Sequence, residues 1–475
     1  MEMIGRAKER DQLLRCERSD KSELVCVYGR RRVGKTFLVE QTLSAFFAFH
    51  VVGSKDASTA AQLRKFGLEL NDRGDADANP PKDWREAFNR LYKVMVSPDA
   101  PRSPHGKAVV FIDEFPWFAK QRSDFLSAFA TFWNRRSTSG QKLLVVICGS
   151  ATSWTIEHML DSSGDLAARV TDSIFLEPFT LAETKEYFDD RGFGWDRQTL
   201  IEMQMVFGGL PFFFSLMRSH QSLWENIDRL CLAPRAQLRN ETMVLLESTM
   251  RKSRIYVDLF RLLSRHKYGV QKHKALEQLG YSASQFARAV DEVVRCGYVR
   301  QYRNMGLAQH PKFLMLVDPF ILFHFSFIDP ANGVAPRRWS DFVADQGRFN
   351  AWRGNAFEVV CLYHVGQIKA ALGIGGVETK EYPWHSVRHD GGAQIDLVIE
   401  RADRIANLCE MKFCDLPYEL SRPHEQELAR KREVYAQETG TRLALKTVLV
   451  SANGTSGYHD GSIAQVITAE DLFRH

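Results

Sequence analysis

The feature that most constrains the fold is a glycine-rich segment, Gly29-Arg-Arg-Arg-Val-Gly-Lys-Thr36, which fits the pattern G-x-x-x-x-G-K-[ST] without exception. It follows an apolar run at residues 24–28 and precedes a helical pattern at residues 37–43. The glycines let backbone N–H groups surround phosphate groups, and the start of the following helix adds a favourable dipole. A chance glycine-rich turn would not combine this strand, this helix and the Lys-Thr pair. The sequence therefore predicts a strand, a phosphate-binding loop and a helix.

The residue types in this loop predict ATP and Mg²⁺ as cofactors. Lys35 is expected to bridge the β- and γ-phosphates, and Thr36 to offer its hydroxyl to Mg²⁺. A second apolar run, residues 109–112, ends in Asp113 and Glu114. Asp113 is expected to hold Mg²⁺ through water, and Glu114 to polarise the water that attacks the γ-phosphate. The predicted nucleotide-contacting residues of the loop are Gly29, Arg30, Arg31, Arg32, Val33, Gly34, Lys35 and Thr36.

Two further residues are candidates for sensing or stabilising the γ-phosphate. Ser150 ends another apolar run, and its hydroxyl is expected either to contact that phosphate or simply to terminate a strand. Arg169 is the candidate arginine finger, with an ordinary surface arginine as the alternative. Strands at residues 45–52, 108–113, 143–149 and 173–176 alternate with helical patterns, which predicts a parallel sheet covered on both faces.

Length and composition limit the class of protein. With 475 residues, two to four domains are expected, at about 100–200 residues per domain. Hydrophobic residues make up 44% and charged residues 25%, as in globular proteins. The start of the chain lacks a secretory signal pattern, and no apolar run approaches the length of a membrane span. The eight cysteines lack paired spacing and are expected to be reduced thiols of a cytoplasmic protein.

Positive charge is concentrated in one region of the chain. Residues 251–318 contain thirteen Lys and Arg against five Asp and Glu, a net charge of +8, whereas the whole chain carries +5. The remainder of the chain is therefore slightly acidic. This distribution predicts a polyanionic partner for residues 251–318, and a solvated basic face with no partner is the alternative.

The same region has the order of a winged helix. Three helical patterns, the third at residues 284–295 with a capping box from Ser282 and Gln285, precede two extended runs at residues 298–302 and 312–317. A winged helix presents its third helix and its ribbon to DNA, so DNA is the expected partner, bound mostly through phosphates and with little sequence preference. A rigid adaptor without DNA contact is the alternative. The candidate DNA contacts are Gln285, Arg288, Arg295, Arg300, Arg303 and Lys312.

A third set of chemistry-bearing residues lies near the C-terminus. Glu358 stands at the start of a helical pattern, Asp396 lies within an extended run, and a second extended run contains Glu410 and Lys412. Glu410 and Lys412 are two residues apart, so they share a strand face that Asp396 on a neighbouring strand can approach. Two converging carboxylates can hold Mg²⁺, and a lysine can orient or deprotonate a water that attacks a phosphodiester.

Four segments together resemble the AAA-type ATPases often described as archaeal, which lie near the STAND branch of P-loop NTPases. The resemblance implies an extra strand between the two Walker strands, which residues 45–52 match, and a helical lid that couples nucleotide state to the C-terminal domains. Family members commonly have glycine before the arginine at Arg169, where this chain has Ala168. The segments are Tyr28–Thr36, Phe111-Ile-Asp-Glu114, Ile147-Cys-Gly-Ser150 and Gly208-Gly-Leu-Pro211.

The C-terminal constellation is similar to the restriction-endonuclease-like PD-(D/E)XK superfamily. The resemblance makes Asp396 and Glu410 metal ligands, Lys412 the catalytic lysine and Glu358 a helix-borne acid, with Ile395 at the proline position. The expected fold class is α/β. The expected domains are a P-loop ATPase core (residues 1–180), a helical lid (181–250), a winged helix (251–330) and a restriction-endonuclease-like domain (339–475).

Two hypotheses of function follow. In the first, the protein is an ATPase that binds DNA through its winged helix and cleaves it with a Mg²⁺-dependent C-terminal domain. In the second, it is a STAND-like signalling switch with protein-binding C-terminal domains and no nuclease activity. A scaffold that binds ATP without hydrolysis is a third reading, against which the intact Asp113-Glu114 pair argues. The oligomeric state, and whether Arg169 acts in cis or in trans, stay open.

Overall fold

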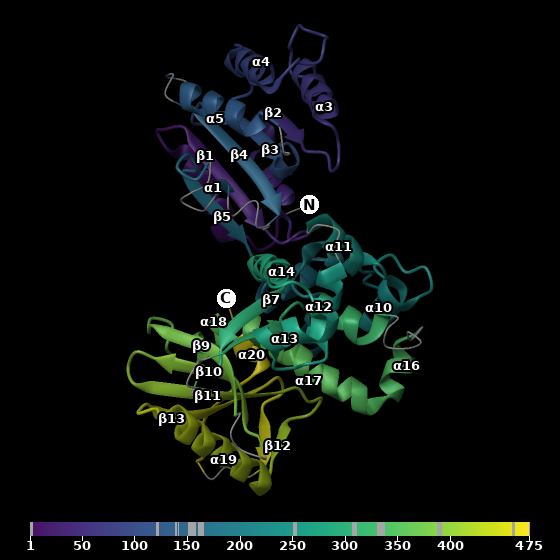
Figure 1. Ribbon diagram of the computed structural model, residues 1–475, viewed down its shortest axis with the longest axis vertical. Coiled ribbons are helices and arrows are strands. Elements are labelled where there is room, and N and C mark those ends of the chain that lie inside the picture. The colour runs from purple at the N-terminus through teal and green to yellow at the C-terminus, as the bar shows by residue number, and fades with distance from the viewer. Residues whose placement is uncertain are drawn as a thin grey trace. The chain divides into compact units, whose positions relative to one another are not determined.

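The computed structural model describes residues 3–119, 123–137, 140, 142–150, 158–159, 166–249, 254–305, 311–329, 338–386, 392–457 and 461–474. The chain forms two compact units, Met1–Pro178 and Phe179–His475 (Figure 1). The sequence between the expected winged helix and the last domain contains Pro330, Gly333 and Pro336, which favours a linker; these three residues lie outside the described residues.

The first unit is built on a five-stranded parallel sheet. Its order is β2-β3-β4-β1-β5. The strands are short apolar runs because a parallel sheet is covered by helices on both faces. The predicted parallel α/β sheet is confirmed. One detail is wrong: the strand that lies between the two Walker strands β1 and β3 is β4, and the run at residues 45–52 gives the edge strand β2. The strands are β1 (Glu23–Gly29), β2 (Phe47–Val52), β3 (Ala108–Asp113), β4 (Leu143–Ser150) and β5 (Asp172–Leu176).

Helices and an aromatic core support this sheet. Asp83 caps the helix α4, whose buried Trp84 and Phe88 pack against Phe125 and Phe129 of α5. Since all five strands are parallel, their carboxyl ends lie at one edge of the sheet, where the phosphate loop begins. The helices are α1 (Ala7–Arg18), α2 (Lys35–Leu43), α3 (Thr59–Asn71), α4 (Trp84–Val96) and α5 (Phe125–Arg136), with single 3-10 turns at Ser44–Phe46 and Phe115–Trp117.

The second unit begins with helices in which Gly208 and Gly209 form a tight turn. Gly208 has φ 62°, in the left-handed region that favours glycine. A Cβ on Gly209 would lie 2.1 Å from the carbonyl oxygen of Phe179, whose N–H donates to the Gly209 carbonyl. Only glycine fits this approach, and the turn packs through Phe213 against Phe320 of α15. The helices are α7 (Leu181–Asp190), α8 (Arg197–Phe207), α9 (Pro211–Phe214), α10 (Leu223–Ile227), a π-turn at Asp228–Leu232, and α11 (Glu241–Thr249).

Residues 254–317 form what we call the helix–sheet module. Three helices pack on a small antiparallel sheet with the order β6-β8-β7. Ser282 caps α14, since its hydroxyl accepts from the backbone N–H of Gln285. The predicted helices and ribbon are present, and a third strand, β6, joins them from between the first two helices. The elements are α12 (Arg254–Ser264), β6 (Val270–Gln271), α13 (Lys272–Leu279), α14 (Ala283–Arg295), β7 (Val299–Arg303) and β8 (Lys312–Leu316).

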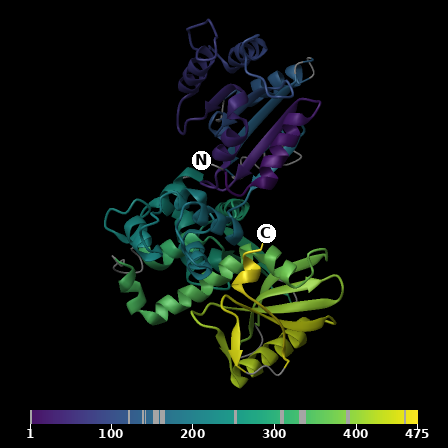
Figure 2. The same ribbon diagram turned by 180° about the vertical axis from the view of Figure 1, so that it is seen from behind.

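The last part of the chain, which we call the C-terminal domain (residues 346–474), is a second α/β structure. Its sheet has the order β15-β13-β11-β10-β9, with β9, β10 and β11 antiparallel and β13 parallel to β11. Figure 2 shows its strands from the opposite side. The sheet elements are β9 (Thr379–His385), β10 (Gln394–Arg401), β11 (Ile405–Lys412), β13 (Ala444–Ser451) and β15 (Ile463–Ile467), with a separate pair, β12 (Tyr418–Leu420) and β14 (Thr455–Gly457).

Two long helices, α17 and α19, accompany this sheet. Among the helices of the described residues, none combines the length and apolar character needed to cross a bilayer. All eight cysteines are free thiols. The remaining helices of the second unit are α15 (Pro319–Phe323), a π-turn at His324–Ile328, α16 (Trp339–Ala344), α17 (Gln346–Tyr363), α18 (Val365–Ala371), α19 (Arg422–Thr439) and α20 (Ala469–Leu472).

Candidate functional sites

The phosphate loop is held in shape by its two glycines. Gly29 ends β1, and a Cβ there would lie 2.4 Å from the carbonyl oxygen of Leu176 on β5. Gly34 has φ 96° and is the N-cap of α2, so its backbone conformation also favours glycine. Between them, residues 30–33 carry the loop around to the start of α2. The loop therefore presents backbone N–H groups at a helix N-terminus, a suitable surface for phosphates.

Lys35 lies inside this loop. Its ammonium donates to the carbonyl oxygens of Gly29 at 3.2 Å and Arg30 at 3.0 Å. Burial lowers the pKa of the Lys35 ammonium from its usual value. The loop thus fixes a poorly hydrated ammonium where phosphates are expected to bind.

Thr36 and Asp113 face each other across the start of α2. The Thr36 hydroxyl donates to Asp113 Oδ2 at 2.7 Å, and Asp113 Oδ1 accepts the backbone N–H of Glu114 at 2.8 Å. A hydroxyl and a carboxylate are oxygen ligands of the kind that Mg²⁺ prefers. Their adjacency therefore fits the predicted metal position beside the phosphates.

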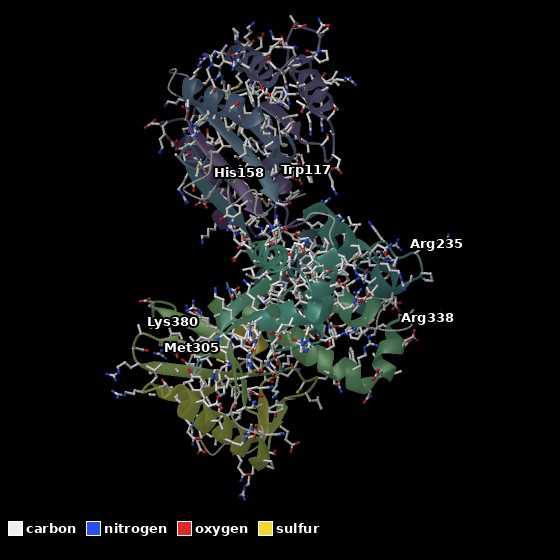
Figure 3. All side chains as sticks on the ribbon, viewed as in Figure 1. Trp117, His158, Arg235, Met305, Arg338 and Lys380 are labelled. Atoms are coloured by element: carbon white, nitrogen blue, oxygen red, sulfur yellow. The ribbon has the colours of Figure 1, made fainter. Side chains whose placement is uncertain are left out.

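Glu114 is held by a residue that the sequence did not point to. The indole Nε1 of Trp117, labelled in Figure 3, donates to Glu114 Oε2 at 3.1 Å. Glu114 itself has φ 48°, so the chain turns sharply just after β3. Gly53, the residue after β2, packs directly against this turn. Its N–H donates to the Asp113 carbonyl at 2.9 Å, and a Cβ on Gly53 would lie 2.4 Å from the Glu114 carbonyl oxygen. Trp117 and Gly53 thus position the candidate general base.

Ser150 lies beside the loop, because it pairs with Gly29 in the register of β4 against β1. Arg169 does not. Its Nε donates to Asn134 near the end of α5, and Thr171, two residues on, bonds to Leu24 near the start of β1. Arg169 therefore lies near the end of the sheet at which β1 begins, whereas the loop follows the other end of β1. The five residue steps from Leu24 to Gly29 separate the two positions by about 17 Å, at about 3.3 Å per strand residue. This position favours a role in trans over a role at the γ-phosphate of its own chain, and the arginine-finger role of Arg169 stays a prediction.

The second set of candidate residues converges in the C-terminal domain. The register pairs Leu397 with Cys409, which places Asp396 across from Glu410 on one face of the sheet. Glu410 and Lys412 share that face, and the Lys412 ammonium lies 2.8 Å from Glu410 Oε1. Asp396 Oδ2 accepts the backbone N–H of Met411 at 2.8 Å, which fixes its carboxylate. Glu358, on α17, reaches the same place.

Three lysines compensate the three acids. Lys431 of α19 lies 2.7 Å from Glu410 Oε2. Lys267 of the helix–sheet module forms an ion pair with Glu358, and its Nζ lies 3.8 Å from Asp396 Oδ1. Lys267 and Lys431 were not among the predicted site residues, since they are far from the acids in the sequence. We call these six residues the acid–lysine cluster: Glu358, Asp396, Glu410, Lys267, Lys412 and Lys431.

Burial and mutual repulsion govern the charges of the acids. Burial, and secondly the nearby Asp396, raise the pKa of Glu358 well above its usual value. Burial and then Glu410 raise the pKa of Asp396. Burial alone would raise the pKa of Glu410, but Lys412 and Lys431 lower it below its usual value. Glu358 and Asp396, the two acids beside Lys267, are thus the ones whose ionised form the surroundings destabilise most.

The donor chemistry of the acid–lysine cluster suits a hard cation, but the arrangement does not. Among the described residues, no group of three or more His, Cys, Asp or Glu side chains is placed to hold a metal ion. Lysine ammoniums contact the carboxylate oxygens that a metal would need. The predicted ligands Asp396 and Glu410 are therefore together, in a state that does not fit Mg²⁺.

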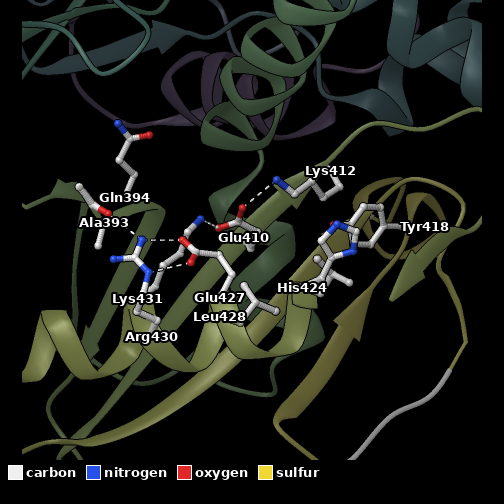
Figure 4. Close-up of a pocket in the computed structure, with 12 residues that line it drawn as sticks. Ala393, Gln394, Glu410, Lys412, Tyr418, His424, Glu427, Leu428, Arg430 and Lys431 are labelled. Atoms are coloured by element: carbon white, nitrogen blue, oxygen red, sulfur yellow. Dashed lines mark hydrogen bonds and ion pairs between the residues drawn. The ribbon is translucent and has the colours of Figure 1, made fainter. Parts of the chain in front are cut away.

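A cavity of about 380 Å³ opens beside Glu410 (Figure 4). Lys412 and Lys431 reach Glu410 from two sides, and Arg430 pairs with Glu427 at the wall. The cavity is thus polar, and its lysines and arginine are paired with the two acids that also line it. Its further lining residues include Gln394, Tyr418, His424 and Leu428.

Most of the candidate DNA contacts are accessible. Gln285, Arg288, Arg303 and Lys312 are exposed. Arg295 forms an ion pair with Asp291 at 2.8 Å. Arg300 differs from the prediction: it is partly buried, which lowers its pKa, and its charge is felt by Glu381 of β9. Arg300 is therefore less accessible than the other candidate contacts, and its contact with DNA stays a prediction.

Comparison with known proteins identifies the first site. Residues 3–199 match a family model described as "ATPase domain predominantly from Archaea". Residues 3–199 are thus similar to an archaeal-type ATPase domain. This ATP-hydrolysing enzyme is 22% identical over 405 residues to an uncharacterized protein of Methanocaldococcus jannaschii, with 84% of each chain covered.

Two solved structures are similar to this chain, and the first of them supports the fold. A Walker-type ATPase of Pyrococcus abyssi is similar, with a TM-score of 0.50 and 14% identity, over 68% of this chain and 96% of that one. The ORC2 protein of Aeropyrum pernix matches with a TM-score of 0.40 and 13% identity, over 70% of this chain and 95% of that one.

Proposed function

We propose that the ATPase binds DNA through its helix–sheet module and cleaves DNA in its C-terminal domain. In this proposal the module is a winged helix and the C-terminal domain is restriction-endonuclease-like. The observation that carries the proposal is the convergence of Glu358, Asp396, Glu410 and Lys412 from one helix and two strands. Residues that the chain keeps far apart meet at one face, beside a polar cavity.

In the first unit, Thr36 and Asp113 are the residues that would hold Mg²⁺, which supplies charge stabilisation when bound. Lys35 binds the phosphates, and Ser150 contacts the γ-phosphate from the end of β4. Glu114, oriented by Trp117, accepts the proton of the attacking water. Each role uses a contact or a register position of this unit.

Cleavage should depend on the carboxylate of Asp396. We expect Asp396→Asn to lower DNA cleavage by roughly 10²-fold or more, because an amide would hold a charge-neutralising cation beside the scissile phosphate much more weakly than a carboxylate does. The assay follows linear and plasmid duplex DNA with full-length protein, ATP and Mg²⁺ or Mn²⁺. ATP turnover should be retained, since Asp396 belongs to the other unit. Asp403→Asn, an exposed acid that follows the same strand, is the matched control. Cleavage by Asp396→Asn at the wild-type rate would contradict the proposal.

DNA affinity should reside in the exposed cations of the helix–sheet module. Replacing Arg288, Arg303 and Lys312 by Ala should lower the slope of log affinity against log salt by roughly three units, at about 0.9 per lost phosphate contact. Fluorescence anisotropy with mixed-sequence duplex DNA measures this slope. The control removes three exposed cations of the same unit outside the module, Lys380, Arg442 and Lys446. An equal effect of both triple variants would place the DNA surface elsewhere.

A second candidate function is a nucleotide-controlled switch without nuclease activity. One observation favours it: Lys267 of the module forms an ion pair with Glu358 of the C-terminal domain, as an internal adaptor would. In that case the salt-dependent binding above should be absent, while ATP hydrolysis continues.

A further inference from the structure

Gln62 is a buried polar residue that was not among the predicted residues of the ATPase site. It lies on α3, the helix that follows β2, and it is 2% exposed. Its side-chain oxygen accepts the backbone N–H of Ser54 at 3.2 Å, and its nitrogen donates to the Ser54 carbonyl at 2.7 Å. The same nitrogen donates to the Trp117 carbonyl at 3.2 Å. Gln62 therefore ties the loop after β2 to the turn after β3.

The helix α3 gives this amide a fixed position. Ser58 caps the helix, since its hydroxyl accepts a backbone N–H of the first turn. Phe66, four residues after Gln62 and so on the same helix face, is buried against Phe49 of β2 and Trp84 of α4. Figure 1 shows α3 beside these two elements. The amide is thus carried by a helix that is packed into the core of the first unit.

Trp117 connects Gln62 to Glu114. Its carbonyl accepts the Gln62 amide, while its backbone N–H donates to the Glu114 carbonyl at 3.0 Å. Its indole Nε1 donates to Glu114 Oε2 at 3.1 Å. Trp117 is thus held at its backbone by Gln62 and holds the carboxylate with its side chain. A displacement of the Trp117 backbone would consequently move the indole that orients Glu114.

Glu114 has a backbone that requires such support. Its φ of 48° lies in the left-handed region, which is unfavourable for a residue with a side chain and persists only where the surroundings fix it. A general base must also lie within hydrogen-bond reach of the proton that it accepts, and small displacements of a catalytic group are costly in rate. The orientation of Glu114 is therefore sensitive to the groups behind it.

We propose that Gln62 is a positioning residue for ATP hydrolysis, which acts through Trp117 to hold the Glu114 carboxylate in line with the attacking water. Within the described part of the chain, the hydrogen bonds of its side chain go to Ser54 and Trp117, and not to the phosphate loop. Gln62 consequently governs turnover and leaves ATP binding to the loop. This inference rests on the proposed role of Glu114 as the base.

The test compares turnover with ATP affinity in the full-length protein. Gln62→Met keeps the length of the side chain and removes its hydrogen bonds. It should lower kcat by about tenfold, which corresponds to about 1.4 kcal/mol of activation free energy, and leave ATP affinity unchanged. Steady-state phosphate release and equilibrium titration with ATP measure the two quantities. Gln41→Met, at an exposed position of α2, is the matched control and should match wild type in both.

A combined variant distinguishes positioning from a general structural role. Residues that act as one unit have non-additive effects on catalysis. Once Glu114→Gln has removed the base, adding Gln62→Met should cause no further loss of the residual turnover, which single-turnover measurements can follow. A residue that merely supports the fold would lower turnover by the same factor in both backgrounds.

A milder substitution covers the case in which Gln62→Met does not fold. Gln62→Glu keeps the side-chain length and an oxygen for the Ser54 N–H, but it replaces the nitrogen that donates to the Trp117 carbonyl. It should show the same selective loss of kcat, cancelled in the Glu114→Gln background. Thermal unfolding verifies that each variant is folded.

Either of two results would overturn the proposal. One is a folded Gln62→Met protein that hydrolyses ATP at the wild-type rate although Glu114→Gln does not, which ends the role of Gln62 alone. The other is a loss that is equal in both backgrounds or is matched by a loss of ATP affinity, which makes Gln62 a structural support. Wild-type turnover by Glu114→Gln would instead end the proposed role of Glu114, so the two failures are distinguishable.

Discussion

Replacing Glu114 by Gln should lower ATP turnover by on the order of 10²-fold or more, the usual scale for general-base catalysis, and leave ATP affinity essentially unchanged. The amide keeps the shape of the side chain and can still meet the indole of Trp117, but it cannot accept the proton of the attacking water. The Thr36–Asp113 contact, which fits the metal position, is untouched. Steady-state phosphate release and equilibrium titration with ATP separate the two effects.

The matched control for this experiment is Glu69→Gln on α3. Glu69 is partly exposed and belongs to the same unit, so the same chemical change there should leave turnover at the wild-type rate. Wild-type turnover by Glu114→Gln would show that another group activates the water. A large loss of ATP affinity would instead show that Glu114 acts in binding.

Lys35→Met should weaken ATP binding itself, by roughly 10- to 100-fold, since hydrogen bonds to charged groups contribute about 1.5–3 kcal/mol. The Lys35 ammonium is already buried before ATP binds, so it loses little further hydration on binding. The variant removes this preformed cation from the phosphates. Titration with a fluorescent ATP analogue measures the affinity. Lys93→Met, on the exposed side of α4, is the control. Unchanged affinity in Lys35→Met would contradict the assignment of the loop.

The parts of the fold that were predictable are those encoded locally. The strands of the first sheet are continuous apolar runs, and α14 begins at a recognisable cap. The two-residue strand β6 exists only because β8 pairs with it, so residues 270 and 271 alone carry no strand pattern. The position of β2 at the edge of the sheet likewise depends on pairing between distant segments.

The candidate sites also combine contacts that are encoded locally with contacts that depend on distant segments. The side-chain period of strands brings Glu410 and Lys412 together, and this was predictable from their spacing. Lys267 meets Asp396 from a different part of the unit, and no local pattern indicates such a partner. The position of Arg169 was not predictable from its local sequence, because it depends on strand pairing: the residue precedes a strand parallel to β1, and so lies where those strands begin.

The close approach of Gly29 to Leu176 has a mechanical consequence. β5 is the last strand of the first unit, and the chain passes into the second unit after Pro178, two residues beyond Leu176. A Cβ added at Gly29 would lie only 2.4 Å from the Leu176 carbonyl oxygen, so the start of the loop and the end of β5 lie in close backbone contact. A change in the backbone of Gly29 would therefore have to be accommodated by the end of β5, two residues before the chain leaves the first unit. The segment that would meet such a change first is the tether that leads to everything downstream.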